Sequence, residues 1–243
     1  MSTFGKFLKG VLQFRKSVRA PMVKKIQEVT AHGHASAVMY ACMDARIKPL
    51  RSSLHLGEIY IVRNAGNMIP IGETVLGGCG HEVSPIAEPA GLDLTVKLGK
   101  IKHVIVCGHS DCAVTLYDIY KNPNKFNMNS PLHHWLEQRG NESLKKLEHR
   151  IGHGPEYNFD AKIDAEEKLT VQDKLSQINT LQQVENITSH NFLAEILEQK
   201  QVNLHALWFE LKTGDLHMFS KANERYVVVG EENINDLIHE VEK

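Results

Sequence analysis

The sequence predicts an α/β protein with a mainly parallel central sheet of four strands, an antiparallel edge strand and flanking helices. Short runs of β-branched and aromatic residues alternate with longer segments of helical periodicity, which is typical of βαβ units with parallel strands. The last of these runs is followed by a Thr-Gly-Asp turn and a further strand, the pattern of a β-hairpin. Together these observations predict a sheet that is parallel in its centre and antiparallel at one edge.

The predicted strands follow in chain order, and the first three end at clusters of polar residues. Four parallel strands are expected at Ala37–Ala41, Glu58–Val62, His103–Cys107 and Asn203–Leu211, and the edge strand is expected at Leu216–Ser220. The carboxyl ends of parallel strands meet at one edge of a sheet, where ligands bind in such folds. We therefore expect the three polar clusters to converge at that edge.

Helices are predicted where apolar residues recur with a helical period. The predicted helices are Ala87–Leu98, Asp111–Tyr120, Pro131 to Glu148 and Asp164 to about Gln199. The longest of them is predicted to start with a capping box formed by Asp164 and Glu167. We expect it to break near His190 and Asn191.

The N-terminal segment differs in charge from the rest of the chain. Residues 1–27 carry seven Lys or Arg and no Asp or Glu, a bias that resembles a mitochondrial transit peptide. Its apolar side chains fall largely on one helical face, which equally suits an amphipathic arm that docks on the core or on a second subunit. We expect residues 1–34 to form a helical arm and possible targeting segment, and residues 35–243 to form a single α/β domain. The expected location is mitochondrial, with the cytoplasm as the alternative.

The composition argues against several classes of partner. A formal net charge of −1 disfavours a strongly basic nucleic-acid surface, and no uninterrupted apolar run approaches the roughly 18 residues that span a membrane. The expected partners are therefore small molecules or copies of the same chain. Four cysteines are too few for a disulfide-stapled secreted scaffold, so a cysteine near a histidine is interpreted as a metal ligand or catalytic group.

A set of potential metal ligands follows two of the predicted strands. Cys42, His109 and Cys112 supply the thiolate and imidazole groups that zinc prefers, and three protein ligands with an open position are typical of a catalytic site. We expect them to bind one Zn²⁺ per chain. His109 and Cys112 are predicted at the start of a helix, whose positive end favours an ionised thiol. Cys107 is interpreted as a core residue and Cys79 as a weaker candidate for metal binding.

Asp44 and Arg46 lie beside the first of these ligands, at a spacing that places both on one side of an extended chain. A guanidinium can hold a carboxylate in a bidentate pair and lower its pKa. We interpret the pair as catalytic, with an ionised Asp44 that accepts a hydrogen bond from hydroxide on the zinc. The alternative is an ordinary surface ion pair.

Three sequence blocks resemble the signatures of β-class carbonic anhydrases: Cys42-Met43-Asp44-Ala45-Arg46, Arg63-Asn64-Ala65-Gly66-Asn67 and His109-Ser110-Asp111-Cys112. Segments 173–183 and 205–209 resemble the animal branch, whose members are often mitochondrial. The resemblance implies the β-carbonic anhydrase fold, with the arm wrapped on a partner in a homodimer or homotetramer. It also implies zinc-dependent, reversible hydration of carbon dioxide (CO₂) to bicarbonate and a proton, in which hydroxide on the zinc attacks CO₂.

Two alternatives stay open at this point. The chain is alternatively a catalytically silent, zinc-stabilised binding or scaffold module, although a structural site needs four protein ligands and no Asp44–Arg46 pair. The second alternative keeps the family but changes the resting state of the site: at low pH, Asp44 itself takes the fourth zinc position and Arg46 is released. A nucleotide-binding α/β protein is disfavoured, because no glycine-rich fingerprint follows a strand.

Overall fold

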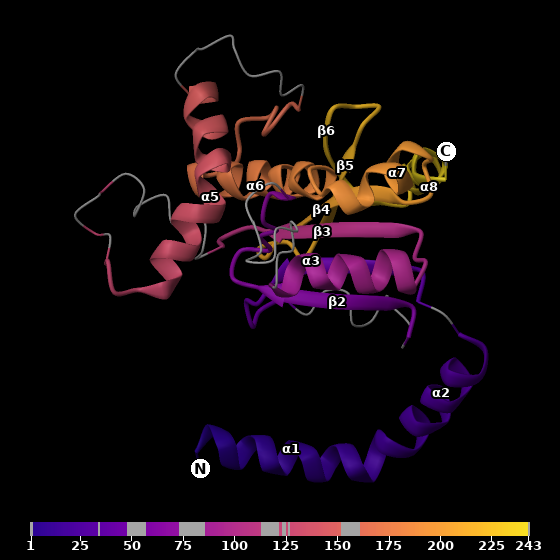
Figure 1. Cartoon of the computed structure of the whole chain (residues 1–243). Coiled ribbons are helices and arrows are strands. Elements are labelled where there is room, and N and C mark those ends of the chain that lie inside the picture. The colour runs from indigo at the N-terminus through magenta and orange to yellow at the C-terminus, as the bar shows by residue number, and fades with distance from the viewer. Residues whose placement is uncertain are drawn as a thin grey trace, which may run out of the picture.

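A computed structural model describes residues 2–33, 35–47, 57–72, 86–112, 122, 125, 127–151 and 161–242 of the chain. Its centre is a sheet of six strands in the order β2-β1-β3-β4-β5-β6 (Figure 1). The strands are β1 (Ala37–Cys42), β2 (Ile59–Asn64), β3 (His103–His109), β4 (Asn203–Phe209), β5 (Leu216–Ser220) and β6 (Arg225–Val228). The first four strands of this order are parallel, and β5 and β6 continue the sheet antiparallel. The predicted α/β class with a mainly parallel sheet is confirmed.

The antiparallel edge has one strand more than the sequence predicts. β6 pairs with β5, with Val228 opposite His217 and Arg225 opposite Ser220. It is four residues long and exposed at both ends, so its sequence is too short to show the alternation of apolar and polar residues that identifies a strand. The edge is therefore a two-strand extension.

The strand order places a topological switch point between β1 and β3. After β1 the chain continues to β2 on one side, and after β2 it returns to β3 on the other side of β1. At such a point the connections diverge and leave a crevice beyond the carboxyl ends of the strands. Cys42 is the last residue of β1 and His109 is the last residue of β3, so both border this crevice.

The helices flank the sheet or form the N-terminal arm (Figure 1). They are α1 (Thr3–Ser17), α2 (Arg19–His32), α3 (Ala87–Leu92), α5 (Pro131–Ile151), α6 (Val171–Thr188), α7 (Ala194–Glu198) and α8 (Ile234–Val241), with a π-helical turn η3 (Asp93–Leu98) after α3 and a 3₁₀ turn η6 (Asn191–Leu193) before α7. The break predicted near His190 and Asn191 is confirmed.

The predicted start of the longest helix is wrong. Asp164 and Glu167 have φ angles of 51° and 54°, in the left-handed region that a right-handed helix excludes. The carboxylate of Asp164 accepts hydrogen bonds from two backbone N–H groups of the following turn. Helix α6 instead begins after Thr170, whose hydroxyl accepts a hydrogen bond from the backbone N–H of Asp173.

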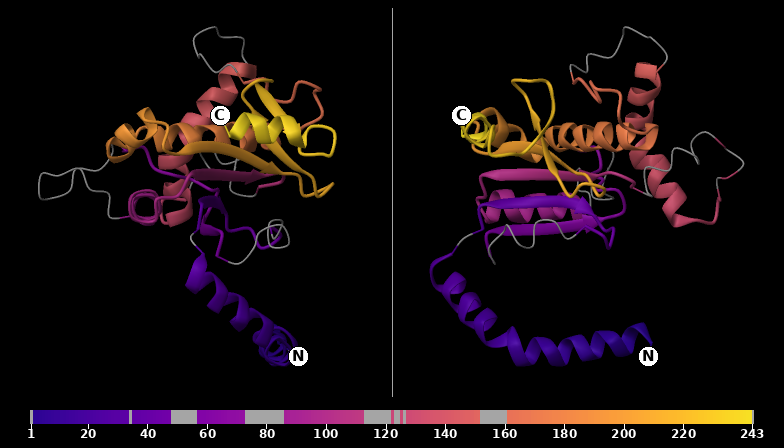
Figure 2. Two further views of the ribbon diagram at one scale, coloured as in Figure 1. Left: turned by 90° about the vertical axis from the view of Figure 1, so that its right-hand side faces the viewer. Right: turned by 180° about the vertical axis from the view of Figure 1, so that it is seen from behind.

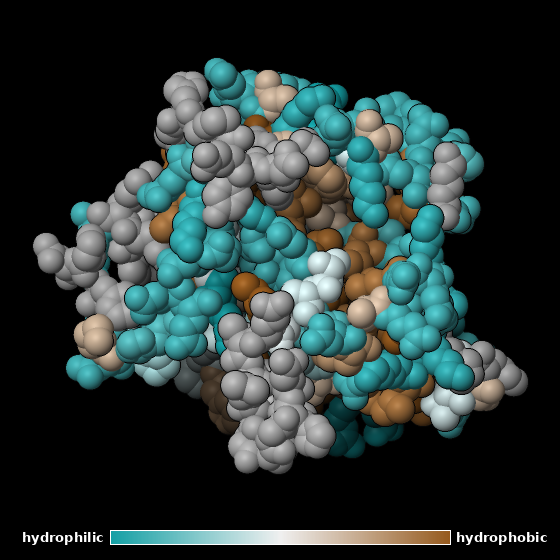
Figure 3. Space-filling model, turned by 45° about the horizontal axis from the view of Figure 1, so that its top comes forward, coloured by the Kyte–Doolittle hydropathy of each residue, from teal (hydrophilic) through white to brown (hydrophobic). Residues whose placement is uncertain are grey.

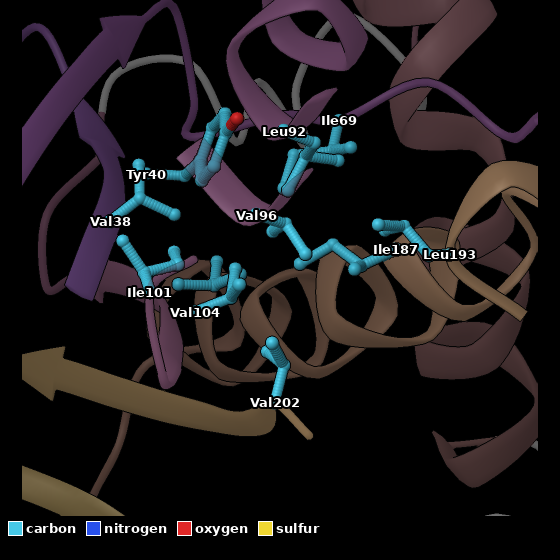
Figure 4. Packing of buried hydrophobic residues seen from close by; sticks show 11 residues of the cluster. Val38, Tyr40, Ile69, Leu92, Val96, Ile101, Val104, Ile187, Leu193 and Val202 are labelled. Carbon is cyan, nitrogen blue, oxygen red and sulfur yellow. The ribbon is translucent and has the colours of Figure 1, made fainter. Parts of the chain in front are cut away.

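The main hydrophobic core lies between the sheet and the helices α3, η3 and α6. Figure 4 shows Val38 and Tyr40 of β1 on one side of this core, with Leu92 and Val96 of the helices facing them. Ile187 of α6 lies in the same cluster. These side chains are at most 4% exposed, and their burial fixes the helices on the sheet.

The arm formed by α1 and α2 extends away from the sheet beyond β2 (Figures 1 and 2). No residue of α1 is buried, and the exposed fraction of Phe4 is 67%.

The face of the molecule shown in Figure 3 is largely hydrophilic, with hydrophobic side chains gathered in a hollow near its centre. Among the described residues, no helix combines the length and the hydropathy needed to cross a membrane.

Candidate metal centre

Three side chains meet at the carboxyl ends of β1 and β3. The ligand atoms of Cys42, His109 and Cys112 all lie within 4.8 Å of one another, and the two Sγ atoms are 3.9 Å apart. The three residues are 1%, 0% and 6% exposed, respectively. In the part of the chain that the structure describes, no other group of three potential metal ligands occurs. The structure thus brings together the three ligands predicted from the sequence.

The imidazole of His109 is oriented with one nitrogen available to a metal. Its Nδ1 lies 2.8 Å from the carbonyl oxygen of Ser110, so Nδ1 carries the proton and donates to that oxygen. Its Nε2 is buried and has no hydrogen-bond partner in the described structure. A buried polar atom without a partner is costly unless a ligand satisfies it, and neutral Nε2 is a common metal ligand. The residues present therefore fit a bound metal ion.

A turn brings Cys112 back to His109. The sequence predicts both residues at the start of a helix, but His109 belongs to β3 and Asp111 has a left-handed φ of 50°. This conformation reverses the chain directly after the strand. Ser110 fixes the turn, because its N–H donates to the carbonyl oxygen of Phe209 at the end of β4 and its hydroxyl accepts from the backbone N–H of Leu211. The remainder of the predicted helix, residues 113–120, lies outside the described residues.

Asp44 and Arg46 form a bidentate ion pair next to the metal ligands. Arg46 Nε donates to Asp44 Oδ1 at 3.0 Å, and Arg46 Nη2 donates to Asp44 Oδ2 at 2.7 Å. The backbone N–H of Arg46 also donates to Asp44 Oδ1, at 2.9 Å. These hydrogen bonds from Arg46 lower the pKa of the Asp44 carboxyl to about 2, so it is ionised at neutral pH. The predicted pairing is present, although a turn and not an extended strand end brings the two residues together.

Arg63, from the second polar cluster, holds the loop that carries the first ligand. Its Nε donates to the carbonyl oxygen of Cys42 at 2.9 Å, and its Nη2 donates to that of Asp44 at 2.8 Å. Asn64 follows it and bonds to Met68 through both its amide and its carbonyl group. The second cluster therefore supplies no metal ligand but fixes the backbone of the neighbouring strand end.

Helix α6 supports the site from the far side of β3. It packs so closely that a Cβ atom at Gly108 would lie 2.0 Å from Thr180 Oγ1. Ser176 Oγ donates to the carbonyl oxygen of His109 at 2.6 Å and accepts from Trp208 Nε1 at 3.1 Å. Sequence reasoning misses Ser176, because 67 residues separate it from His109. Its only signal is its place in the segment 173–183, which resembles the animal β-class enzymes.

The buried thiols differ in how easily they ionise. The pKa of Cys42 is lowered to about 4, first by the hydrogen bond from Cys112 and also by His109. The pKa of Cys107 is raised to about 12, because burial disfavours its thiolate. A metal binds the thiolate, so Cys42 is suited to coordination and Cys107 is not. The interpretation of Cys107 as a core residue is confirmed, and Cys79 lies outside the described residues.

The donor set indicates the kind of metal centre. Two thiolates and an imidazole suit zinc, and three protein ligands leave one coordination position for a water molecule or substrate. An ionised carboxylate beside that position can orient a water-derived group. The fold and the site therefore define an α/β protein with a catalytic type of metal centre at the switch point of its sheet.

Comparison with known proteins identifies the family. Residues 37–216 match the model of the carbonic anhydrase family, and the chain belongs to that family. It is 42% identical to beta carbonic anhydrase 1 of Caenorhabditis briggsae over 252 residues, which cover 98% of this chain and 93% of the relative. Beta carbonic anhydrase 1 of Caenorhabditis elegans is also 42% identical, over 250 residues that cover 97% and 92% of the two chains.

Solved structures agree with this assignment at the level of the fold. The β-carbonic anhydrase CcaA matches with a TM-score of 0.74 at 19% identity, over 94% of this chain and 100% of the other. The Coccomyxa β-carbonic anhydrase matches with a TM-score of 0.66 at 19% identity, over 96% and 91% of the two chains. The predicted β class and animal branch are confirmed, and with them the activity: the chain is a lyase that hydrates CO₂ reversibly.

Proposed function

We propose that the chain performs this hydration with one zinc ion held by Cys42, His109 and Cys112, and that Asp44 and Arg46 act on the nucleophile. The observation that carries the proposal is the buried, unpartnered Nε2 of His109 in a group with two cysteine sulfurs. Thiolate and imidazole donors of this number and burial are typical of catalytic zinc. This donor set supports zinc as the metal, with one ion per chain.

When bound, zinc supplies a Lewis acid that lowers the pKa of a coordinated water, so that hydroxide is available near neutral pH. An ionised Asp44 can only accept hydrogen bonds. Its Oδ2 receives Arg46 Nη2 at 2.7 Å and keeps acceptor capacity for the O–H of the attacking group. A proton held toward Asp44 directs an oxygen lone pair away from it, toward the carbon of CO₂. Asp44 thus acts by orientation, and Arg46 holds it in place.

The position of Asp44 supports a resting site with an open fourth position. Both of its carboxylate oxygens accept hydrogen bonds from Arg46. In the alternative in which Asp44 takes the fourth zinc position, Arg46 is released and these contacts are absent. The bidentate pair therefore favours the open arrangement over the alternative in which Asp44 closes the site.

Stopped-flow CO₂ hydration of zinc-replete protein tests the proposal, with Asp44→Ala as the diagnostic variant. We expect kcat to fall about 100-fold, because the orienting acceptor is lost while the ligands remain. Asp93→Ala is the matched control, since Asp93 forms an exposed ion pair with Lys97 on η3. Zinc-replete wild-type protein without hydration from about pH 6.5 to about pH 9 would contradict the proposal, because hydroxide on zinc forms in that range. That result would favour the zinc-stabilised binding module.

The assembly is proposed to be a homodimer or homotetramer in which the arm packs on a partner chain. The apolar side chains of α1 are exposed, and an isolated helix of this length is marginal in water without packing. One structural relative is described as a tetrameric β-carbonic anhydrase from Sordaria macrospora. Sedimentation equilibrium of the whole chain measures the number of chains in the assembly; a monomer at micromolar concentration would contradict the proposal.

The location is proposed to be mitochondrial, with the cytoplasm as the alternative. Residues 1–27 carry seven basic and no acidic residues, which supports a targeting role. Fluorescence imaging of the full chain, tagged at its C-terminus, tests this in animal cells. Replacement of Arg15, Lys16 and Arg19 by Gln should abolish mitochondrial signal, whereas diffuse fluorescence of the unmodified chain would contradict the proposal.

A further inference from the structure

Arg46 is held by a second carboxylate in addition to Asp44. Its Nη1 donates to Asp111 Oδ2 at 2.6 Å, and its Nη2 donates to the carbonyl oxygen of Asp111 at 2.8 Å. Two of its N–H groups point to Asp44 and two point to Asp111. The planar guanidinium is thereby fixed between the loop after β1 and the turn after β3.

Asp111 has the backbone conformation that this bridge requires. Its φ of 50° lies in the left-handed region, which Asp and Asn adopt more readily than most residues. The same conformation turns both its carbonyl oxygen and its carboxylate toward Arg46, as the two hydrogen bonds record. The turn from His109 to Cys112 requires this backbone conformation but not a carboxylate. The carboxylate of Asp111 serves the contact with Arg46.

Asp173 holds this turn from behind. Its Oδ1 accepts from the backbone N–H of Asp111 at 2.7 Å, and its Oδ2 accepts from Thr170 Oγ1 at 2.9 Å. Thr170 is the N-cap of α6, so the turn is anchored to the first turn of a long helix. A continuous chain of contacts therefore runs from α6 through Asp111 and Arg46 to Asp44.

We infer that Asp111 is a positioning residue for hydration: anchored by Asp173, it fixes Arg46 and through it the direction of the Asp44 carboxylate. The inference rests on the proposed function, in which Asp44 orients the nucleophile. It adds a residue outside the Asp44–Arg46 pair on which the geometry of that pair depends. If Arg46 contacted Asp44 alone, the guanidinium and the carboxylate could rotate together. The contacts with Asp111 remove that freedom.

The exposure of the bridge separates positioning from stability. The side chains of Arg46 and Asp111 are 48% and 73% exposed. Ion pairs this exposed contribute little to folding, because water and salt screen them. Loss of the Asp111 carboxylate should therefore change catalysis and leave the melting temperature nearly unchanged.

Two variants separate the carboxylate from the turn. Asp111→Gly removes the side chain, and glycine adopts positive φ without strain. Asp111→Asn keeps a side-chain acceptor and tolerates the same φ. We expect Asp111→Gly to lower kcat about tenfold, with KM and zinc content unchanged, because the reacting geometry is loosened. Asp111→Asn should recover most of that loss, and the exposed variant Asp93→Asn serves as the matched control.

A second readout does not depend on turnover. The ¹⁵N NMR signal of Arg46 Nε–H, assigned by its absence in Arg46→Lys, reports whether the guanidinium is fixed. We expect a sharp, slowly exchanging signal in the wild type and in Asp111→Asn, and a broadened or rapidly exchanging one in Asp111→Gly. If wild-type protein fails to hydrate CO₂, the proposed function fails, whereas this signal still decides whether Asp111 holds Arg46.

Three results would overturn the inference. The first is a kcat for Asp111→Gly within about twofold of the wild type, which is too small a change for a lost positioning contact. The second is a loss of activity matched by an equal loss of zinc or by a large drop in melting temperature, since either indicates a structural role for the turn. The third is an unchanged Arg46 Nε–H signal in Asp111→Gly.

Discussion

The metal centre and the N-terminal arm differ in where their stabilising contacts come from. Cys42, His109 and Cys112 are at most 6% exposed, and hydrogen bonds from within the same chain fix the backbone around them. In α1, by contrast, no residue is buried, and Phe4 and Leu12 are 67% and 60% exposed. The comparison teaches that one chain supplies the chemistry of the site, whereas the described part of the same chain leaves the apolar residues of α1 uncovered.

The largest effect is expected when a ligand is removed from the metal centre. Cys112→Ala should release zinc and abolish hydration, because two protein ligands do not retain zinc as three do. Cys107→Ala is the control, since Cys107 is equally buried but lies in an apolar cluster on β3. It should keep about one zinc per chain, and only stability should fall, by about 1 kcal/mol. Metal analysis by mass spectrometry measures both variants; zinc retained in Cys112→Ala would refute the ligand set.

Charges placed on the arm test the other side of the comparison. The double substitution Leu8→Glu with Leu12→Glu should dissociate the assembly, because two carboxylates would be desolvated on a partner chain. Sedimentation velocity measures the change. Leu98→Glu is the control, since Leu98 is 75% exposed on η3 and lies outside the arm. Unchanged sedimentation of the double variant would show that the arm does not hold the chains together.

A smaller effect is expected at the support behind the site. Ser176→Ala removes the hydroxyl that bonds to the His109 carbonyl and leaves buried Trp208 Nε1 without an acceptor. The free energy of unfolding should fall by about 1–3 kcal/mol. Ser17→Ala removes a hydroxyl that bonds to the backbone on exposed α1, and it should change stability by only a few tenths of a kcal/mol. Urea denaturation measures the free energy of unfolding of both variants. Equal losses would mean that the Ser176 contacts stabilise the fold no more than the exposed Ser17 contact does.

The smallest effect concerns pH. The pKa of Asp44 is lowered to about 2 by Arg46, so folding favours its ionised form. Its contribution to stability is therefore complete above about pH 4 and lost as the pH falls toward 2. The difference in melting temperature between the wild type and Asp44→Asn should be constant from about pH 8 to about pH 5, then shrink below about pH 4. A difference that already changes between pH 8 and pH 5 would point to another group.

The same comparison explains how much the sequence reveals. Strand ends are local signals, so the convergence of Cys42 with His109 and Cys112 follows from the sequence and the parallel topology. Asp173 contacts Asp111 across 62 positions of the sequence, and Ser176 contacts His109 across 67. No local sequence pattern encodes such contacts.

Errors in the sequence-based elements have a physical cause as well. Left-handed φ angles at Asp111, Asp164 and Glu167 interrupt segments that the sequence predicts as helical. These interruptions are not visible in the sequence, because Asp and Glu mark a left-handed conformation less clearly than glycine does. The short strand β6 is defined by its pairing with β5 and not by its own four residues. These features depend on tertiary contacts, which override local propensity.

The position of the metal itself tests the central claim most directly. Crystals of the whole protein should give one anomalous zinc peak per chain, between His109 Nε2 and the Sγ atoms of Cys42 and Cys112. The expected distances are about 2.0–2.1 Å to nitrogen and about 2.3 Å to sulfur, with Asp44 still paired to Arg46. A peak elsewhere, or a fourth protein ligand that completes the coordination, would contradict the account of a catalytic site open to water.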